Sequence, residues 1–176
     1  MNKILFNTNS LFREFSKAIN EKKHLEAKSL LEKILTINPK IFEANHNLAI
    51  LSLQLGDINN SIKYFEKSVE LNPKLPKVYF NLALAYDKKG ETDQAIMNFK
   101  RVIELEPNNS LALYNIGYLY NRKKNTNSAQ NYLLQSLNLN PKFILAYHEL
   151  FGLFDRSNQL DKYKNLLNKI KNLLKD

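Results

Sequence analysis

Cysteine and tryptophan are absent from the 176-residue chain. Without cysteine, the protein has no disulfide framework, no thiolate metal site and no cysteine nucleophile. Only four glycines and five prolines occur, which leaves little material for long flexible loops. No apolar run approaches the roughly 18 residues needed to cross a bilayer, and the N-terminal apolar run of three residues is too short for a signal-peptide core. We therefore expect no membrane insertion and a cytoplasmic location.

Acidic residues are fewer than basic ones, and the net charge is +9. Lysine outnumbers arginine 22 to 4, and asparagine occurs 25 times, a bias that AT-rich codon usage also produces. The basic residues are spread along the whole chain and are interspersed with 17 acidic ones. This pattern is typical of a solvated surface and does not favour nucleic acid as a partner.

The few prolines form a regular series. Pro39, Pro73, Pro107 and Pro141 are each 34 residues from the last, and only Pro76 falls outside the series. The period divides the chain into a lead-in, residues 1–7, and five units, residues 8–41, 42–75, 76–109, 110–143 and 144–176. No remainder is left for a second domain.

The third unit predicts two amphipathic helices joined by a tight turn. The apolar face of the first helix contains Tyr79, Leu82, Ala83 and Tyr86, and that of the second contains Ala95, Phe99, Val102 and Ile103. Pro76 is expected to begin the first helix and Gly90 to end it. Thr92 or Asp93 is expected to cap the second helix, which ends before Pro107.

The other units repeat this pattern position by position. One position of the first helix holds small residues, namely Ala49, Ala83 and Gly117, and one position of the second holds large apolar residues, namely Leu31, Phe65, Phe99, Leu133 and Leu167. In this register the sequence resembles an array of tetratricopeptide repeats (TPRs) over residues 8–176. The resemblance implies an all-α fold, a right-handed α-solenoid of helix–turn–helix repeats.

The last helix is expected to pack on one side only. Leu160, Tyr163, Leu167, Ile170 and Leu174 form a narrow apolar stripe beside a wide polar face. This pattern indicates a capping helix, and its alternative is a helix that binds a partner or a second copy of the chain.

Catalytic motifs are missing. The three histidines, His24, His46 and His148, belong to no metalloprotease motif, and the chain has neither a nucleophile elbow nor a phosphate-binding glycine loop. We expect a protein that is not an enzyme and that binds no cofactor and no metal.

The resemblance implies that the first helices line a concave groove for a protein or peptide ligand. The exposed positions of these helices predict groove residues Asn47, Lys77, Phe80, Asn81, Lys88, Tyr114, Asn115, Tyr118, Arg122 and His148. Asn47, Asn81 and Asn115 occupy one position in successive units, where an amide can pair with a peptide backbone of any sequence. Such a row is similar to the one in the TPR superhelix of O-GlcNAc transferase. The alternative is chance, because one residue in seven is asparagine.

The aromatic groove residues also have two interpretations. Phe80, Tyr114 and Tyr118 flank the asparagine row, and they are either apolar anchors for a ligand or part of the core between repeats. Of the five side chains that form the carboxylate clamp of chaperone-binding TPR domains, only Asn47 and Lys77 are matched. We therefore do not predict binding of chaperone tails.

Three functions are compatible with this sequence. The first is a non-catalytic protein–protein interaction scaffold that binds an extended peptide or a partner helix in its groove. The alternative is a substrate-recruiting module of a glycosyltransferase or sulfotransferase whose catalytic part is separate or truncated. The third, an RNA-binding helical repeat, is disfavoured because the period is 34 and no continuous basic stripe occurs.

Overall fold

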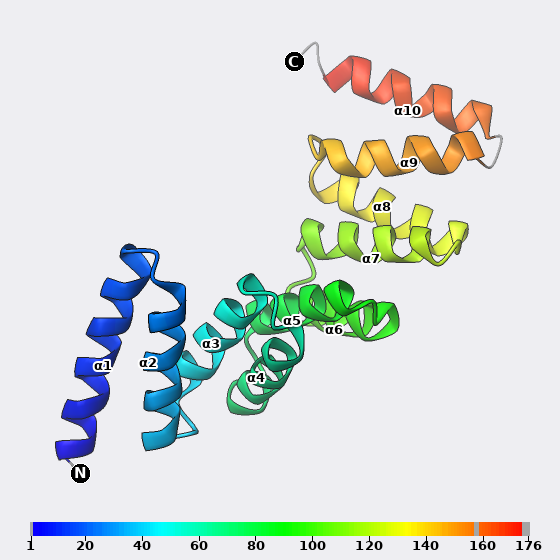
Figure 1. The fold of residues 1–176 in the computed structure, drawn as a ribbon. Coiled ribbons are helices and arrows are strands. Elements are labelled where there is room, and N and C mark those ends of the chain that lie inside the picture. Colours follow the sequence, from blue (N-terminus) through cyan, green and yellow to red (C-terminus); the bar gives the residue numbers. More distant parts are fainter. Residues whose placement is uncertain (1, 157–158, 174–176) are drawn as a thin grey trace. The chain divides into compact units, whose positions relative to one another are not determined.

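The computed structural model describes residues 2–156 and 159–173, and this part of the chain contains ten α-helices and no strand (Figure 1). The side chains of residues 2–7, 171 and 173 are outside the description. The helices are α1 (Asn2–Asn20), α2 (His24–Ile37), α3 (Phe42–Gln54), α4 (Ile58–Leu71), α5 (Pro76–Lys89), α6 (Thr92–Leu105), α7 (Ser110–Arg122), α8 (Thr126–Leu139), α9 (Ile144–Arg156) and α10 (Leu160–Leu173).

Helix boundaries repeat with the period of the prolines. The second helices α2, α4, α6, α8 and α10 each begin 34 residues after the last, and so do the first helices α3, α5, α7 and α9. The predicted period and the all-helical repeat fold are therefore confirmed. Helix α1 begins at Asn2, so residues 2–7 continue into the first helix rather than standing apart from it.

The chain divides into two compact units, residues 1–95 and residues 96–176, and the division falls inside α6. In the first unit, one core cluster is centred on Leu31, Ile34 and Leu48, and a second on Phe65 and Val78. In the second unit, one cluster joins α8, α9 and α10, with the members Ala129, Leu133, Leu137, Ala146, Tyr147, Leu150, Leu153, Phe154 and Leu166.

The predicted large apolar position is buried in four of its five occurrences: Leu31, Phe65, Phe99 and Leu133 are at most 1% exposed. The fifth is wrong, because Leu167 is 36% exposed and its neighbour Leu166, at 6%, is buried instead. Helix α8 packs on both α7 and α9, whereas α10, within the described residues, packs mainly on α9 and reaches α8 through a hydrogen bond from Nζ of Lys162 to Oε1 of Gln130 at 3.2 Å. The side chains that face α9 are therefore the ones buried in α10, and Leu166 is among them whereas Leu167 is not. Of the remaining stripe, Leu160 is exposed and Leu174 lies outside the described residues.

Gly117 shows why the small position is small. A Cβ atom built on it would lie 2.7 Å from Cγ and 3.1 Å from the backbone nitrogen of Leu133, which is closer than atoms pack. Ala49 and Ala83, at the same position in other units, are fully buried. The position therefore sets how closely the two helices of a pair approach, as the sequence predicted.

The turn between the helices of a pair requires a left-handed backbone. Gly56 (φ 81°) and Gly90 (φ 88°) supply it in two of the 34-residue repeats, and Gly90 ends α5 as predicted. Lys22 (φ 58°) and Lys124 (φ 59°) adopt it at the corresponding position of two others. A side chain in this conformation costs about 1–2 kcal/mol relative to glycine.

The cap of the second helix lies one residue before the predicted one. Helix α6 begins at Thr92, so neither Thr92 nor Asp93 precedes it. In α4 the cap is Asp57, whose Oδ1 accepts a hydrogen bond from the backbone N–H of Asn60 at 3.4 Å. In α8 it is Asn125, whose side chain accepts from the N–H of Ser128 at 3.1 Å. The expectation for Thr92 and Asp93 was therefore wrong.

The carbonyl groups of three prolines of the series accept hydrogen bonds from the following first helix. The hydroxyl of Tyr79 donates to the carbonyl of Pro73, and that of Tyr147 to the carbonyl of Pro141, each at 3.0 Å. In an earlier unit the amide of Asn45 donates to the carbonyl of Pro39, also at 3.0 Å. Asparagine and tyrosine side chains thus make the same hydrogen bond, from a first helix to the carbonyl of the proline that precedes it.

None of the helices in residues 2–156 and 159–173 is long and apolar enough to cross a membrane.

Gly117 and Gly152 form a matched pair for a stability test. Alanine in place of either helical glycine gains up to about 1 kcal/mol of helix propensity. At Gly152 the nearest atoms to an added Cβ belong to the flexible guanidinium of Arg156, at 3.8–4.0 Å, so we expect Gly152→Ala to stabilise the protein. At Gly117 overpacking costs about 1–3 kcal/mol, so we expect Gly117→Ala to destabilise it.

Urea denaturation followed by circular dichroism measures both changes. Equal shifts of the two midpoints in the same direction would contradict the close approach of α7 and α8.

Candidate peptide-binding surface

All ten predicted groove residues lie on first helices. The first unit contains Asn47 on α3 and Lys77, Phe80, Asn81 and Lys88 on α5, whereas the second contains Tyr114, Asn115, Tyr118 and Arg122 on α7 and His148 on α9. The three asparagines are half-buried, and Lys77, Lys88 and His148 are exposed. Each unit therefore brings part of the predicted set together on its own first helices.

Asn47 lies in the wall of a hollow in the first unit. The hollow has a volume of about 460 Å³ and is lined by Phe15, Ser16, Ile19, Asn20, His24, Asn47, Ile50, Leu51 and Gln54. It therefore lies where the end of α1 and the start of α2 meet α3. Its walls combine apolar side chains with several neutral hydrogen-bonding groups.

Asn81 is in contact with a buried histidine of the preceding first helix. Its Nδ2 lies 3.3 Å from Nε2 of His46, which is stacked on Phe42 (ring centroids 5.6 Å apart) and meets the edge of Phe65 (5.9 Å). With its proton on Nδ1, the neutral imidazole accepts the amide N–H through Nε2. Burial lowers the pKa of His46, and the positive charge of Lys77 lowers it further.

Aromatic residues of the second unit are partly core and partly surface. Tyr114 lies with its ring centroid 4.9 Å from that of Phe143 and 6.3 Å from that of Tyr118, and burial raises its pKa. The guanidinium carbon of Arg122 lies 5.9 Å from the Tyr118 ring centroid. Tyr114 and Tyr118 are both half-buried, so part of each ring remains accessible beside Asn115, whose Nδ2 donates to the backbone carbonyl of Leu111 at 2.8 Å.

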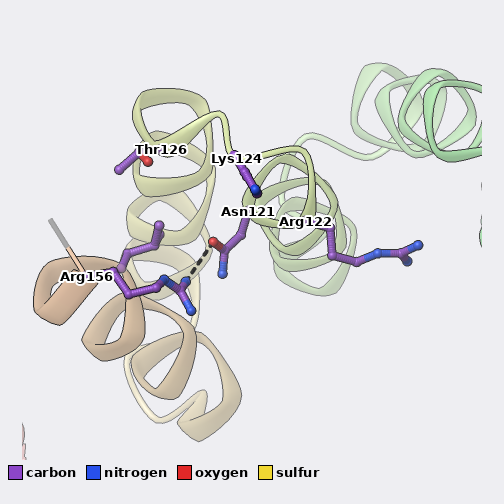
Figure 2. Close-up of a pocket in the computed structure, with 6 residues that line it drawn as sticks. Asn121, Arg122, Lys124, Thr126 and Arg156 are labelled. Atoms are coloured by element: carbon purple, nitrogen blue, oxygen red, sulfur yellow. Dashed lines mark hydrogen bonds between the residues drawn. The ribbon is translucent and has the colours of Figure 1, made fainter.

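A second hollow, of about 480 Å³, lies between the end of α7, the start of α8 and the end of α9, and Figure 2 shows its lining. The lining residues are Asn121, Arg122, Lys124, Thr126, Leu153 and Arg156. The Nη2 of Arg156 donates to Oδ1 of Asn121 at 2.9 Å, and Nδ2 of Asn121 donates to Oε2 of Glu149 at 2.7 Å. Asn121 is thus held from both ends of its amide. In Figure 2 the guanidinium of Arg122 points away from this pair.

The two hollows occupy the same place in the repeat. Five residues that line the second hollow are each 102 residues, or three periods, after a residue that lines the first: Asn121 after Ile19, Arg122 after Asn20, Thr126 after His24, Leu153 after Leu51 and Arg156 after Gln54. Both hollows lie where the turn of one pair meets the next first helix. The fold therefore makes this depression in both units, and the side chains decide its chemistry.

Sequence reasoning missed part of the second hollow. Arg122 was predicted as a groove residue, and Asn121 and Arg156 as further exposed positions of the first helices, but Lys124 was not predicted. The signal for Lys124 was present in the repeat alignment, because this residue follows α7 at the turn position held by glycine in two other repeats.

His148, the last of the predicted groove residues, does not line the hollow that Arg122 lines. It lines a separate apolar hollow of about 540 Å³, together with Pro141, Lys142, Ile144, Tyr147, Phe151 and Ile170.

Within residues 2–156 and 159–173, no group of three or more histidine, aspartate and glutamate side chains is arranged to hold a metal ion.

Three segments match tetratricopeptide repeat families: residues 76–109 and 98–131 match "Tetratricopeptide repeat", and residues 51–90 match "TPR repeat". No curated protein matches the chain.

Among solved structures, the chain is similar to the MamA protein (21% identity, 93% of this chain and 89% of that chain covered, TM-score 0.86). It is also similar to a tetratricopeptide repeat protein from Parabacteroides merdae (20% identity, 97% and 68%, TM-score 0.84). A third structure is YrrB, described as a TPR protein with an unusual peptide-binding site (24% identity, 80% and 73%, TM-score 0.74). The TM-scores of 0.74 to 0.86 show that these proteins share the fold of this chain.

The buried imidazole of His46 predicts a pH dependence of stability. Its pKa is lowered in the folded protein, so the unfolded chain binds the proton more tightly below about pH 6.5. The free energy of unfolding should therefore fall as the pH drops from about 6.5 towards the lowered pKa, and His46→Gln should flatten this slope. Urea denaturation across pH 5–8 measures it.

His148→Gln is the matched control, because the side chain of His148 is 85% exposed. It should keep the slope of the wild type. Equal slopes for the wild type and His46→Gln would show that protonation of His46 does not oppose folding.

Proposed function

The chain is a tetratricopeptide repeat protein, and we propose that it is a non-catalytic interaction module that binds a peptide segment of a partner protein on its first-helix faces. The observation that carries the proposal is the hollow that recurs beside the first helices of both units. Volumes of about 460 and 480 Å³ fall within the range of ligand-binding clefts. The similarity to YrrB, described as having a peptide-binding site, supports the same class of ligand.

The asparagines on the first helices suit a peptide backbone. An amide side chain carries two donors on nitrogen and an acceptor oxygen. The contacts of Asn81 with His46 and of Asn115 with Leu111 are made through Nδ2 and orient each amide. The oxygen of an amide held in this way can accept a hydrogen bond from a peptide N–H. Asn47 itself lines the hollow of the first unit.

Half-buried aromatic rings supply apolar contact beside the amides. The ring of Tyr118 is stacked near that of Tyr114, and the guanidinium of Arg122 lies over it. These contacts order the ring in the unbound protein. A ring that is ordered in advance loses little conformational entropy on binding. We propose that Tyr114 and Tyr118 contact a ligand side chain while the amides contact its backbone.

The choice of an interaction module over an enzyme rests on the inventory of reactive groups. The sequence has no cysteine, and its three histidines lie on three different helices, α2, α3 and α9. A hydrolase would need a nucleophile with a base within hydrogen-bond reach. The proposal therefore assigns binding alone to this chain.

Replacement of Asn81 and Asn115 by alanine tests the proposal. Each unit loses one hydrogen bond, worth about 0.5–1.5 kcal/mol, so the affinity for a peptide bound on either unit should fall roughly two- to tenfold. A display library of random twelve-residue peptides, selected on the immobilised wild type, supplies the ligands, and fluorescence anisotropy measures their affinity for each variant.

The matched control is the double variant Asn59→Ala and Asn131→Ala, which changes exposed asparagines on the second helices α4 and α8. It should bind the selected peptides as the wild type does. Equal binding by the wild type and by Asn81→Ala with Asn115→Ala, at unchanged helicity, would reject the first-helix surface.

A further inference from the structure

The hollow at the ends of α7 and α9 differs from its counterpart in charge. Lys124 and Arg156 line it, whereas Gln54 stands where Arg156 does in the first unit, and the amide of Asn121 replaces the apolar side chain of Ile19. Within residues 2–156 and 159–173, neither Lys124 nor Arg156 forms an ion pair with a carboxylate. These two cations therefore line this hollow, whereas no lysine or arginine lines its counterpart in the first unit.

We propose that this basic hollow binds a carboxylate of the peptide ligand, either an aspartate or glutamate side chain or the C-terminal group. The proposal rests on the peptide-binding function above and names the chemical group that the second unit selects. The hollow with its lining residues is shown in Figure 2.

The hydrogen-bond chain Glu149–Asn121–Arg156 prepares the guanidinium for this role. Glu149 accepts from Nδ2 of Asn121, which leaves the amide oxygen directed at Nη2 of Arg156. A guanidinium has five N–H donors, and Asn121 accepts from one of them. The remaining N–H groups of the guanidinium of Arg156 are still available, and two of them can bind the two oxygens of a carboxylate.

Charge balance favours a carboxylate over a phosphate. Lys124 and Arg156 contribute two positive charges, and Glu149, bonded to Asn121, contributes one negative charge at the back of the site. The guanidinium of Arg122 points away and lies by the Tyr118 ring. The remaining charge of about one unit matches a monoanion, whereas a phosphate group carries about −1.5 to −2 at neutral pH.

The position of Lys124 fits this assignment. It occupies the left-handed turn position, with φ 59°, where Gly56 and Gly90 stand in two other repeats and Lys22 in a third. Figure 2 shows its side chain extending from the turn towards Asn121. A flexible ammonium at the edge of the hollow can follow the carboxylate that Arg156 orients.

Peptide selection on matched charge variants tests the proposal. A library of random twelve-residue peptides with free C-termini is selected on the wild type. We expect an aspartate or glutamate at a fixed position, or a dependence on the free C-terminus. Changing that acid to its amide, or amidating the C-terminus, identifies the source and should weaken binding roughly tenfold, as for the loss of a charge-assisted hydrogen bond.

The variant Lys124→Gln with Arg156→Gln should bind the acidic peptide and its amide form equally. Both residues are exposed, so the fold is retained. The control Lys164→Gln with Lys169→Gln removes the same charge from exposed sites on α10 and should keep the preference for the acid. Transfer of Asn121 and Arg156 to the equivalent positions of the first unit, as Ile19→Asn with Gln54→Arg, should strengthen the binding of acidic peptides.

The outcomes separate the two proposals. If the wild type enriches no peptide, the peptide-binding function itself is overturned. If it enriches neutral peptides, or if the acid preference survives in Lys124→Gln with Arg156→Gln, that function stands and the carboxylate site is overturned. Tighter binding of a phosphoserine peptide than of its glutamate form would also overturn the choice of a carboxylate.

Discussion

The structure depends on the close approach of the two helices in each pair. Gly117 has no room for a Cβ against Leu133, and in other units a fully buried alanine occupies the same position. Ala49 of α3 shares a core cluster with Phe65 of α4, so the pairs α3–α4 and α7–α8 are built on the same small-to-large contact. The remaining face of each first helix is free to vary, and the candidate surface lies there.

Much of the fold could be predicted because the informative patterns are local or periodic. Proline spacing, the apolar faces and Gly90 are properties of one pair, and repetition averages out accidents in any single unit. The failures occurred where a neighbour changes the outcome. Leu167 was expected to be buried by analogy with Leu133, but among the described residues α10 packs mainly on α9 and has no further helix on its other side, so Leu166 is buried instead. Cap positions were missed by one residue because the sequence does not mark the first helical residue.

The candidate site was predictable as a set of positions and not as a shape. His46 and His148 occupy the same position of the repeat, yet His46 is buried against Asn81, whereas His148 is exposed. The two histidines differ in exposure because α5 packs against α3 and covers His46. The identity of one residue in one repeat does not reveal whether a later helix will cover it. The basic hollow was missed for a related reason: its cations come from a turn and from the next first helix, and they meet only after the pairs have packed.

Repetition also explains how such a site can acquire chemistry without loss of stability. The hollow is produced by the packing of buried residues such as Leu51 and Leu153, which are alike in the two units. Its charge is decided by Gln54 in one unit and Arg156 in the other, both exposed at the end of a first helix. Exposed positions away from the core tolerate substitution at small cost to folding. Selectivity for a ligand can therefore change at the rim of each hollow while the contacts that fix the helix pairs stay the same.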